Sequence, residues 1–340
     1  INGQKEGVLR YGFSLQSVDD EVLQNIKRKN LSTEGLLQLA EYRYNERDYR
    51  TDFFTELILG MPGDTLDKHY ESLKYSIDTI GVSNIDIHQL NLFMGAEMLD
   101  SDDHIKYQLD KRYRIFIGAF GIYKIGMEEV PCAEIDETVV SSNSLSFDDY
   151  LQCRIMNLLV KIYIDHDPFK EVLGLIRRLK LSVFDLLLLI KEEFLNKCDS
   201  LNLLIEDFVT ATQKPLFECR EDVERFVSHR SNVEKYISGE LGTNELLYSK
   251  ARAFLECNDD LHLVLQESVL CYLRRNNLLT QELEEYVKQA VKYSKLKKFD
   301  FNKVQEIKED SFTFDFIKAG EFGYMVDPDK IKVDRIDIKF

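Results

Sequence analysis

The chain has 340 residues, a length that predicts two domains, or three at most. It carries 44 Lys and Arg residues against 60 Asp and Glu residues, which gives a formal net charge of −16. This acidic balance argues against nucleic acid as a partner, because a protein that grips phosphates needs a basic surface. No apolar run approaches the ~18 residues that a membrane span requires, and no secretory signal is visible.

The cysteines are too dispersed for a local metal motif. They stand at positions 132, 153, 198, 219, 257 and 271, and no two are closer than 14 positions. This spacing excludes the short Cys pairs that hold zinc or iron–sulfur centres. Most of them fall inside helical patterns and are interpreted as buried thiols, which indicates a reducing, cytoplasmic setting.

Residues 1–112 alternate between strand and helix patterns, which predicts βαβ units and a parallel sheet or barrel. The near-continuous apolar run in the second strand is typical of a strand covered on both faces. Ser17 is the expected N-cap of the first helix, with Asp20 completing its capping box. Strands are expected at 7–14, 53–59 and 85–93, and helices at 19–29, 33–44 and 66–80.

The rest of the chain divides into three segments. Residues 113–145 are expected to be a connecting segment with short strands, following a charged loop at 100–114. Residues 146–298 read as a helical domain that opens with a capping box at Ser146 and ends with a helix over Gln281–Lys297. Residues 299–340 read as a short β tail. An aromatic stripe is interpreted as core rather than as a substrate wall: Tyr113, Phe116, Phe120 and Tyr123.

Five residues near the predicted strand ends are candidates for binding. Gln16 follows the first strand, and its amide can both donate to and accept from a ribose or a carboxylate. Arg28 ends the next helix and can bind a carboxylate with two hydrogen bonds, although a solvated helix-end cation is the simpler reading. Glu56 is an acid within an apolar strand, which is costly unless it is paired or used. Gly60 and Gly63 form a corner where a ligand or another backbone can approach closely.

Two stretches together resemble a known family. "SLQSVDDEVLQNIKRKN", followed by "ELILGMPGDT", is similar to the second half of the radical S-adenosylmethionine core. More narrowly it resembles the group that includes cobalamin-binding radical enzymes and oxygen-independent coproporphyrinogen oxidase. The resemblance spans about residues 7–160 and implies half of a (β/α)₆ barrel that holds S-adenosylmethionine at its carboxyl ends. It implies that Gln16 and Glu56 contact the ribose or amino group, that Arg28 pairs with the methionine carboxylate, and that Gly60 and Gly63 form the cofactor turn.

The same resemblance implies parts that this sequence lacks. The family holds a [4Fe–4S] cluster on a CxxxCxxC loop, and no such motif occurs here. That loop, the first barrel strands and any cobalamin domain are expected in a missing N-terminal region, so the isolated chain is expected to be inactive. The third strand also ends in "FMGAEM", without the proline and threonine usual in the family. The predicted fold class is α/β: a partial parallel barrel, an all-α domain and a short β tail.

Other functions stay open. The substrate, whether a small molecule, a lipid or a saccharide, is not indicated. The chain can instead be a non-catalytic acidic interaction protein whose helical domain docks a partner. A metal-free barrel lyase or isomerase would have to use Glu56 and His88. His88 is either an acid–base group or a core histidine. His166 either joins Asp165 and Asp167 as a metal ligand or belongs to a turn before a helix.

Overall fold

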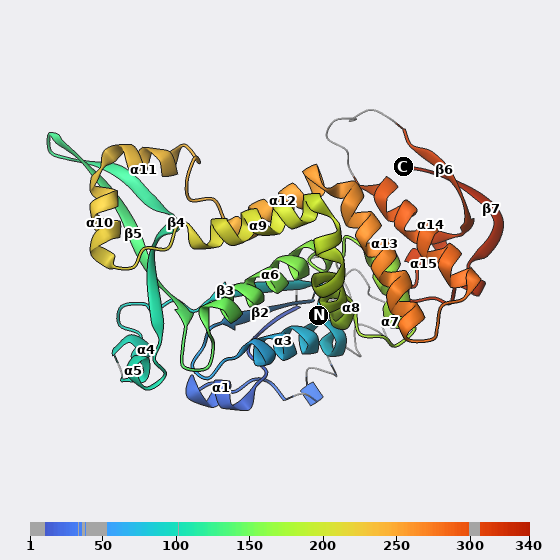
Figure 1. Ribbon diagram of the computed structural model, residues 1–340, viewed down its shortest axis with the longest axis horizontal. Coiled ribbons are helices and arrows are strands. Elements are labelled where there is room, and N and C mark those ends of the chain that lie inside the picture. The colour runs from blue at the N-terminus through green and yellow to red at the C-terminus, as the bar shows by residue number, and fades with distance from the viewer. Residues whose placement is uncertain (1–10, 33, 36–37, 39–52, 101, 299–306) are drawn as a thin grey trace, which may run out of the picture.

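The computed structural model describes residues 11–32, 34–35, 38, 53–100, 102–298 and 307–340, and most of the predicted helix 33–44 lies outside them. Within these residues the chain is a mixed α/β protein with three separate small sheets and many helices (Figure 1). One large apolar cluster joins the parallel sheet, the helical segment and the C-terminal strands into a shared core. No helix in the described part is long and apolar enough to cross a membrane.

The N-terminal sheet is parallel, as predicted, with the strand order β1-β2-β3. Its third strand ends at Gln89, four residues earlier than expected, because the chain then leaves the sheet to pair with a hairpin. The carboxyl ends of all three strands therefore lie at one edge of the sheet. The strands are β1 (Tyr11–Gln16), β2 (Phe53–Leu59) and β3 (Asn84–Gln89).

The two faces of this sheet differ in burial. On one face Leu57 and Ile85 are buried in the main core, against the helix that follows β2. On the other face the strand register aligns Ser14, Glu56 and Asp86 in a row that is only half-buried. The expectation that both faces of β2 are covered is therefore wrong. Alternation along the strand places Glu56 on the half-buried face, and Leu57 and Leu59 on the buried one.

The helices after β1 and β2 differ in how well the sequence predicts them. The helix expected over residues 66–80 is present as α3 (Leu66–Lys74), which continues into the π-helix η2 (Tyr75–Ile80). The first helix, α1 (Asp20–Asn25), is shorter than expected. Its N-cap is Asp19 rather than Ser17, because the Asp19 carboxylate accepts a hydrogen bond from the Val22 amide.

The connecting segment is a long hairpin rather than a set of short strands. It consists of β4 (Asp110–Ile125) and β5 (Glu128–Ser141), after two short helices, α4 (Glu97–Asp100) and α5 (Asp103–Lys106). The two strands pair antiparallel along most of their length, with an irregularity between Ile115 and Phe120. Figure 1 shows the hairpin reaching away from the main core, with α10 (Arg220–Ser228) and α11 (Arg230–Ile237) beside it. The predictions of a loop at 100–114 and of short strands were wrong because glycines and charges interrupt the alternation that marks a strand.

The segment between Phe147 and Lys297 is helical, as the sequence predicts. The side chains of Ser146 and Ser182 cap α6 and α8, and the last helix has the predicted bounds. Most of these helices pack on the parallel sheet or on one another, whereas α10 and α11 pack on the hairpin. The helices are α6 (Phe147–Tyr163), α7 (Lys170–Arg178), α8 (Val183–Leu189), the π-helix η3 (Ile190–Phe194), the 3₁₀ turn η4 (Leu195–Lys197), α9 (Asp199–Gln213), α10 (Arg220–Ser228), α11 (Arg230–Ile237), α12 (Glu245–Glu256), α13 (Asn258–Arg275) and α14 (Gln281–Lys297).

The C-terminal tail forms a two-stranded antiparallel sheet of β6 (Glu309–Phe314) and β7 (Lys332–Lys339). Between them lie a short helix that the sequence analysis did not expect, α15 (Phe316–Gly320), and a 3₁₀ turn, η5 (Pro328–Lys330). Aromatic rings from the tail pack against tyrosines of α14, mostly edge to face, which attaches the tail to the helical segment.

Candidate functional site

Three of the five predicted site residues meet around Ser14, near the end of β1. The Ser14 hydroxyl donates to Oε2 of Glu56 over 2.7 Å and accepts a hydrogen bond from the Gln16 amide. The Arg28 guanidinium donates to the Ser14 carbonyl oxygen over 3.0 Å. Gln16 has a φ of +63°, and the pairing of β1 with β2 shifts between Ser14 and Gln16. This local bulge turns the Gln16 side chain back toward Ser14.

Arg28 reaches the strand end because of the way α1 terminates. Lys27 is left-handed, with a φ of +54°, and its amide donates to the Gln24 carbonyl, while the Arg28 amide donates to the Leu23 carbonyl. This pair of hydrogen bonds is a Schellman motif, which reverses the chain at a helix C-terminus. Arg28 therefore lies beyond the end of the helix rather than within it. The exposed Arg28 side chain folds back to β1. Lysine rarely adopts the left-handed conformation that ends α1, so the sequence did not predict this helix end.

A cavity of about 640 Å³ adjoins Arg28 on the side of the sheet that α1 and η2 cover. Its wall includes Leu15, Arg28, Asn30 and Tyr75. The Asn30 amide nitrogen donates to the Ser17 carbonyl over 2.7 Å, whereas its Oδ1 is buried without a hydrogen-bond partner in the described part of the chain. A buried acceptor beside a guanidinium is an arrangement that a polar ligand would complete.

Contacts within the chain explain why glycine occupies both positions, Gly60 and Gly63. Both have positive φ angles, +90° and +83°. A Cβ at Gly63 would lie 2.7 Å from Nδ2 of Asn25, whose amide donates to the Pro62 carbonyl. The glycine thus permits close approach of α1 to this corner. The Gly60 amide donates to Oδ2 of Asp64 over 3.1 Å, so this donor is used internally.

Asp64 is a buried acid that the sequence analysis did not single out. Its side chain accepts hydrogen bonds from the amides of Gly60 and Thr65. Burial raises its pKa to about 7, although these two hydrogen bonds and the Lys68 ammonium favour the charged form. The position after Pro62-Gly63, just before the Thr65 cap of α3, is the signal that marks Asp64 as part of the turn.

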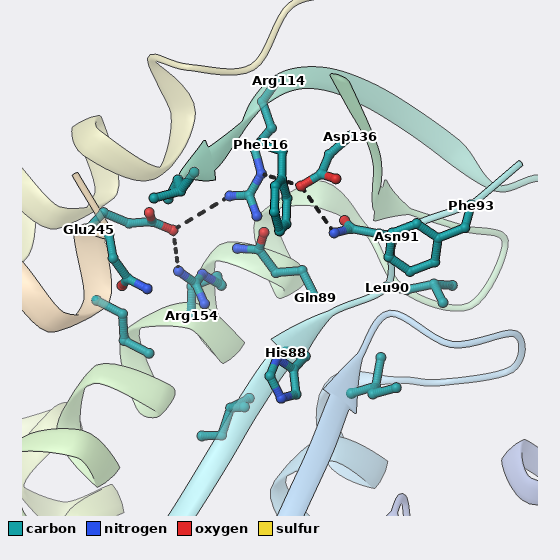
Figure 2. A pocket seen from close by; sticks show the side chains of 15 residues that line it. His88, Gln89, Leu90, Asn91, Phe93, Arg114, Phe116, Asp136, Arg154 and Glu245 are labelled. Carbon is teal, nitrogen blue, oxygen red and sulfur yellow. Dashed lines mark hydrogen bonds and ion pairs between the residues drawn. The ribbon is translucent and has the colours of Figure 1, made fainter. Parts of the chain in front are cut away.

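A second cavity, of about 540 Å³, lies at the carboxyl end of β3 (Figure 2). Beyond β3 the chain pairs with the hairpin, since Leu90 accepts a hydrogen bond from the Val139 amide and Asn91 bridges to Thr138. This pairing brings the base of the hairpin over the strand end. The wall combines residues of β2, β3, the hairpin, α6 and α12: Ile58, Ile87, His88, Gln89, Leu90, Asn91, Phe93, Arg114, Phe116, Ile117, Asp136, Arg154, Asn244, Glu245 and Leu246.

Two arginines and two acids form the charged side of this cavity. Arg154 of α6, only 3% exposed, donates from Nη2 to Oε1 of Glu245 over 2.6 Å. Arg114 of β4 makes longer ion pairs, 3.7 Å to Asp136 and 4.0 Å to Glu245. Burial raises the pKa of Asp136, and the Arg114 charge opposes this shift. The Asn91 amide also donates to Asp136.

The sequence did not predict this charged group. Of the residues that line the cavity, it drew attention only to His88 and Phe116. Arg154 carried the available signal, because an arginine lies among apolar residues on a helix that is buried around most of its circumference. His88 is exposed and lines the cavity, so it is not a core histidine, and its acid–base role stays a prediction. Phe116 likewise lines the cavity, whereas Tyr113 and Phe120 pack against α10 and α11.

No group of three His, Cys, Asp or Glu side chains suited to a metal ion occurs among the described residues. All six cysteines are described, and each is a free thiol on a different stretch of the chain. His166 and Asp167 both have positive φ angles, +68° and +50°, as expected for the turn before α7. The turn interpretation of this segment is therefore favoured over the metal site.

Comparison with known proteins assigns no family to the chain. No protein-family model matches its sequence, and no curated protein matches it.

Proposed function

We propose that the carboxyl ends of β1 and β2 bind S-adenosylmethionine, and that the chain is part of a radical S-adenosylmethionine enzyme. The observation that carries the proposal is the cluster around Ser14, in which Gln16, Arg28 and Glu56 are linked by hydrogen bonds. These are three residues that the sequence resemblance assigns to the cofactor. Ligands of parallel α/β folds bind at this end of the strands.

The partial barrel belongs to the same proposal. The three parallel strands are covered by helices on one face, and Glu56 and Asp86 lie on the half-buried opposite face. In a (β/α) barrel the helices cover the outer face of the strands, and the inner face meets the remaining strands. The arrangement is consistent with a barrel segment whose inner face carries the Ser14–Glu56–Asp86 row.

Each residue of the cluster has a distinct role in this proposal. The Glu56 carboxylate accepts hydrogen bonds from a ribose hydroxyl or from the methionine amino group. Gln16 provides both a donor and an acceptor at the same strand end. Arg28 pairs with the methionine carboxylate, which is a planar partner for its guanidinium.

The [4Fe–4S] cluster does not fit the residues that the structure describes. Such a cluster needs several thiolates at one place. The six thiols are spread from β5 to α13, and none of them lies in β1, β2 or β3. In this proposal the cluster, and cobalamin if it is used, are held by residues other than those of this chain, which contributes the cofactor contacts alone.

Calorimetric titration of the full chain with S-adenosylmethionine tests the proposal. Arg28→Ala should weaken binding by about 1.5–3 kcal/mol, the value of a charge-assisted hydrogen bond. Affinity for 5′-methylthioadenosine, which lacks the carboxylate, should be unchanged by the same substitution. Arg225→Ala, on an exposed arginine of α10, is the matched control. Failure of the unmodified chain to bind S-adenosylmethionine would reject the proposal. Equal losses for both ligands would reject the role of Arg28.

The second candidate is a non-catalytic interaction protein. It is favoured by the tip of the hairpin, where Tyr123, Ile125 and Met127 are all exposed. Exposed apolar residues that lie together on a projecting element are typical of a surface that binds another protein. This candidate differs from the docking role expected for the helical domain, because the exposed residues lie on the hairpin. It predicts no binding of S-adenosylmethionine.

A further inference from the structure

The cavity at the carboxyl end of β3 contains cationic groups whose hydrogen-bonding capacity is only partly used. Arg154 donates to Glu245, and its guanidinium lies 5.5 Å from the centre of the Phe208 ring. Its Nε is buried without a hydrogen-bond partner among the described residues, and the same holds for Nε of Arg114 and Oε1 of Gln89. Figure 2 shows these three side chains converging on the same space from α6, the hairpin and β3. Buried polar atoms left without partners are costly, so a ligand that satisfies them would be bound favourably.

Arg114 is the side chain best placed to meet a ligand. Its ion pairs with Asp136 and Glu245, at 3.7 and 4.0 Å, are longer than hydrogen bonds. The guanidinium can therefore turn toward a bound group at little cost. Arg154, in contrast, is held by its 2.6 Å contact with Glu245 and supplies a fixed positive charge behind it.

The rest of the cavity wall is largely apolar and partly open. Phe116 is 41% exposed and Phe93 is 60% exposed, and Ile58 and Leu246 continue the wall. Exposed aromatic rings beside partly satisfied guanidinium groups make an amphipathic pocket, and its volume of about 540 Å³ suits a small molecule.

We propose that this cavity binds a small organic carboxylate, with the carboxylate against Arg114 and Arg154 and an apolar or aromatic body on Phe116 and Phe93. The planar carboxylate matches the fork of a guanidinium. Asp136 and Glu245 already balance the charges of the two arginines, so they repel the two negative charges of a phosphate more strongly than the single charge of a carboxylate.

This site goes beyond the proposed function and is tested without S-adenosylmethionine. The cavity shares Ile58 and His88 with the half-buried face of the sheet that carries Glu56. If the proposed function holds, a carboxylate bound here would be the substrate. If the proposed function fails, the affinity for a carboxylate still tests this site independently.

The probes are benzoate, benzamide and phenylphosphonate, which share one ring and differ in the charged group. Their affinities for the full chain are measured by ligand-observed NMR and calorimetry. Benzoate should bind at least about tenfold more tightly than benzamide. Arg114→Gln should remove about tenfold or more of the benzoate affinity, and Phe116→Ala should weaken benzoate and benzamide alike. Arg112→Gln, on the same strand but outside the cavity wall, is the control that should leave binding unchanged.

The experiment has four outcomes that would overturn the proposal. They are absence of benzoate binding, equal affinity for benzamide, tighter binding of phenylphosphonate, and an Arg114→Gln variant that binds benzoate normally. Should Arg114→Gln fail to fold, the benzoate–benzamide comparison in the unmodified chain and the Phe116→Ala variant still decide the matter.

Discussion

Asp64 should make the stability of this protein depend on pH, because its carboxyl is buried at the corner after β2. Its side chain is 2% exposed and accepts hydrogen bonds from the amides of Gly60 and Thr65. Burial raises its pKa from 3.8 to about 7, and the nearby Asp19 carboxylate adds to the shift. At a pH between these two values, Asp64 keeps its proton in the folded chain but has released it in the unfolded chain.

The sign and size of the effect follow from this difference. Because the folded state binds more protons, the free energy of unfolding falls as pH rises from about 4 to about 7. At 1.36 kcal/mol per pKa unit, the full loss from Asp64 is about 4 kcal/mol. The part that falls between pH 5 and pH 8 is about 2.5 kcal/mol.

The assay compares the unmodified chain with Asp64→Asn by urea unfolding at pH 5 and pH 8. Asparagine does not titrate. The free energy of unfolding of Asp64→Asn, relative to that of the unmodified chain, should therefore be about 2.5 kcal/mol higher at pH 8 than at pH 5. The amide can satisfy only one of the two backbone donors, which costs about 1–3 kcal/mol at both pH values and cancels in the comparison. Asp67→Asn, at an exposed acid of α3, controls for the loss of a negative charge. A stability difference between the two chains that is the same at both pH values would refute the reasoning.

Two further substitutions test the packing of the sites. Glu245→Gln removes the charge that pairs with Arg154 inside the protein and should lower the free energy of unfolding by about 3 kcal/mol. A loss below about 1 kcal/mol in urea unfolding would show that the pair is solvated. Gly63→Ala should cost about 1–3 kcal/mol, because φ is +83° and the new Cβ would lie 2.7 Å from the Asn25 amide. Gly81→Ala, also at positive φ but with no atom within 4 Å of the added Cβ, isolates the backbone cost. Equal losses at the two glycines would contradict the proposed contact.

The sequence alone determined the features that depend on neighbouring residues. The caps at Ser146 and Ser182 and the bounds of Gln281–Lys297 agree with the structure, because an N-cap and an apolar helix face are set within a few turns of the chain. The parallel order of β1, β2 and β3 was also predictable, since strands separated by helices pair in this way. The candidates Gln16 and Glu56 followed from the same reading, as polar residues near the ends of buried strands.

Tertiary structure decided the features that depend on distant residues. The long hairpin was missed because its glycines weaken the alternation of polar and apolar residues. Packing against α10 and α11 supplies stabilisation that this sequence pattern does not indicate. Ser14 became the centre of the first site only because the strand register places it opposite Glu56. The charged cavity joins Arg114, Arg154 and Glu245, which lie up to 131 positions apart. Local patterns carry no information on such proximity, because the fold alone brings these side chains together.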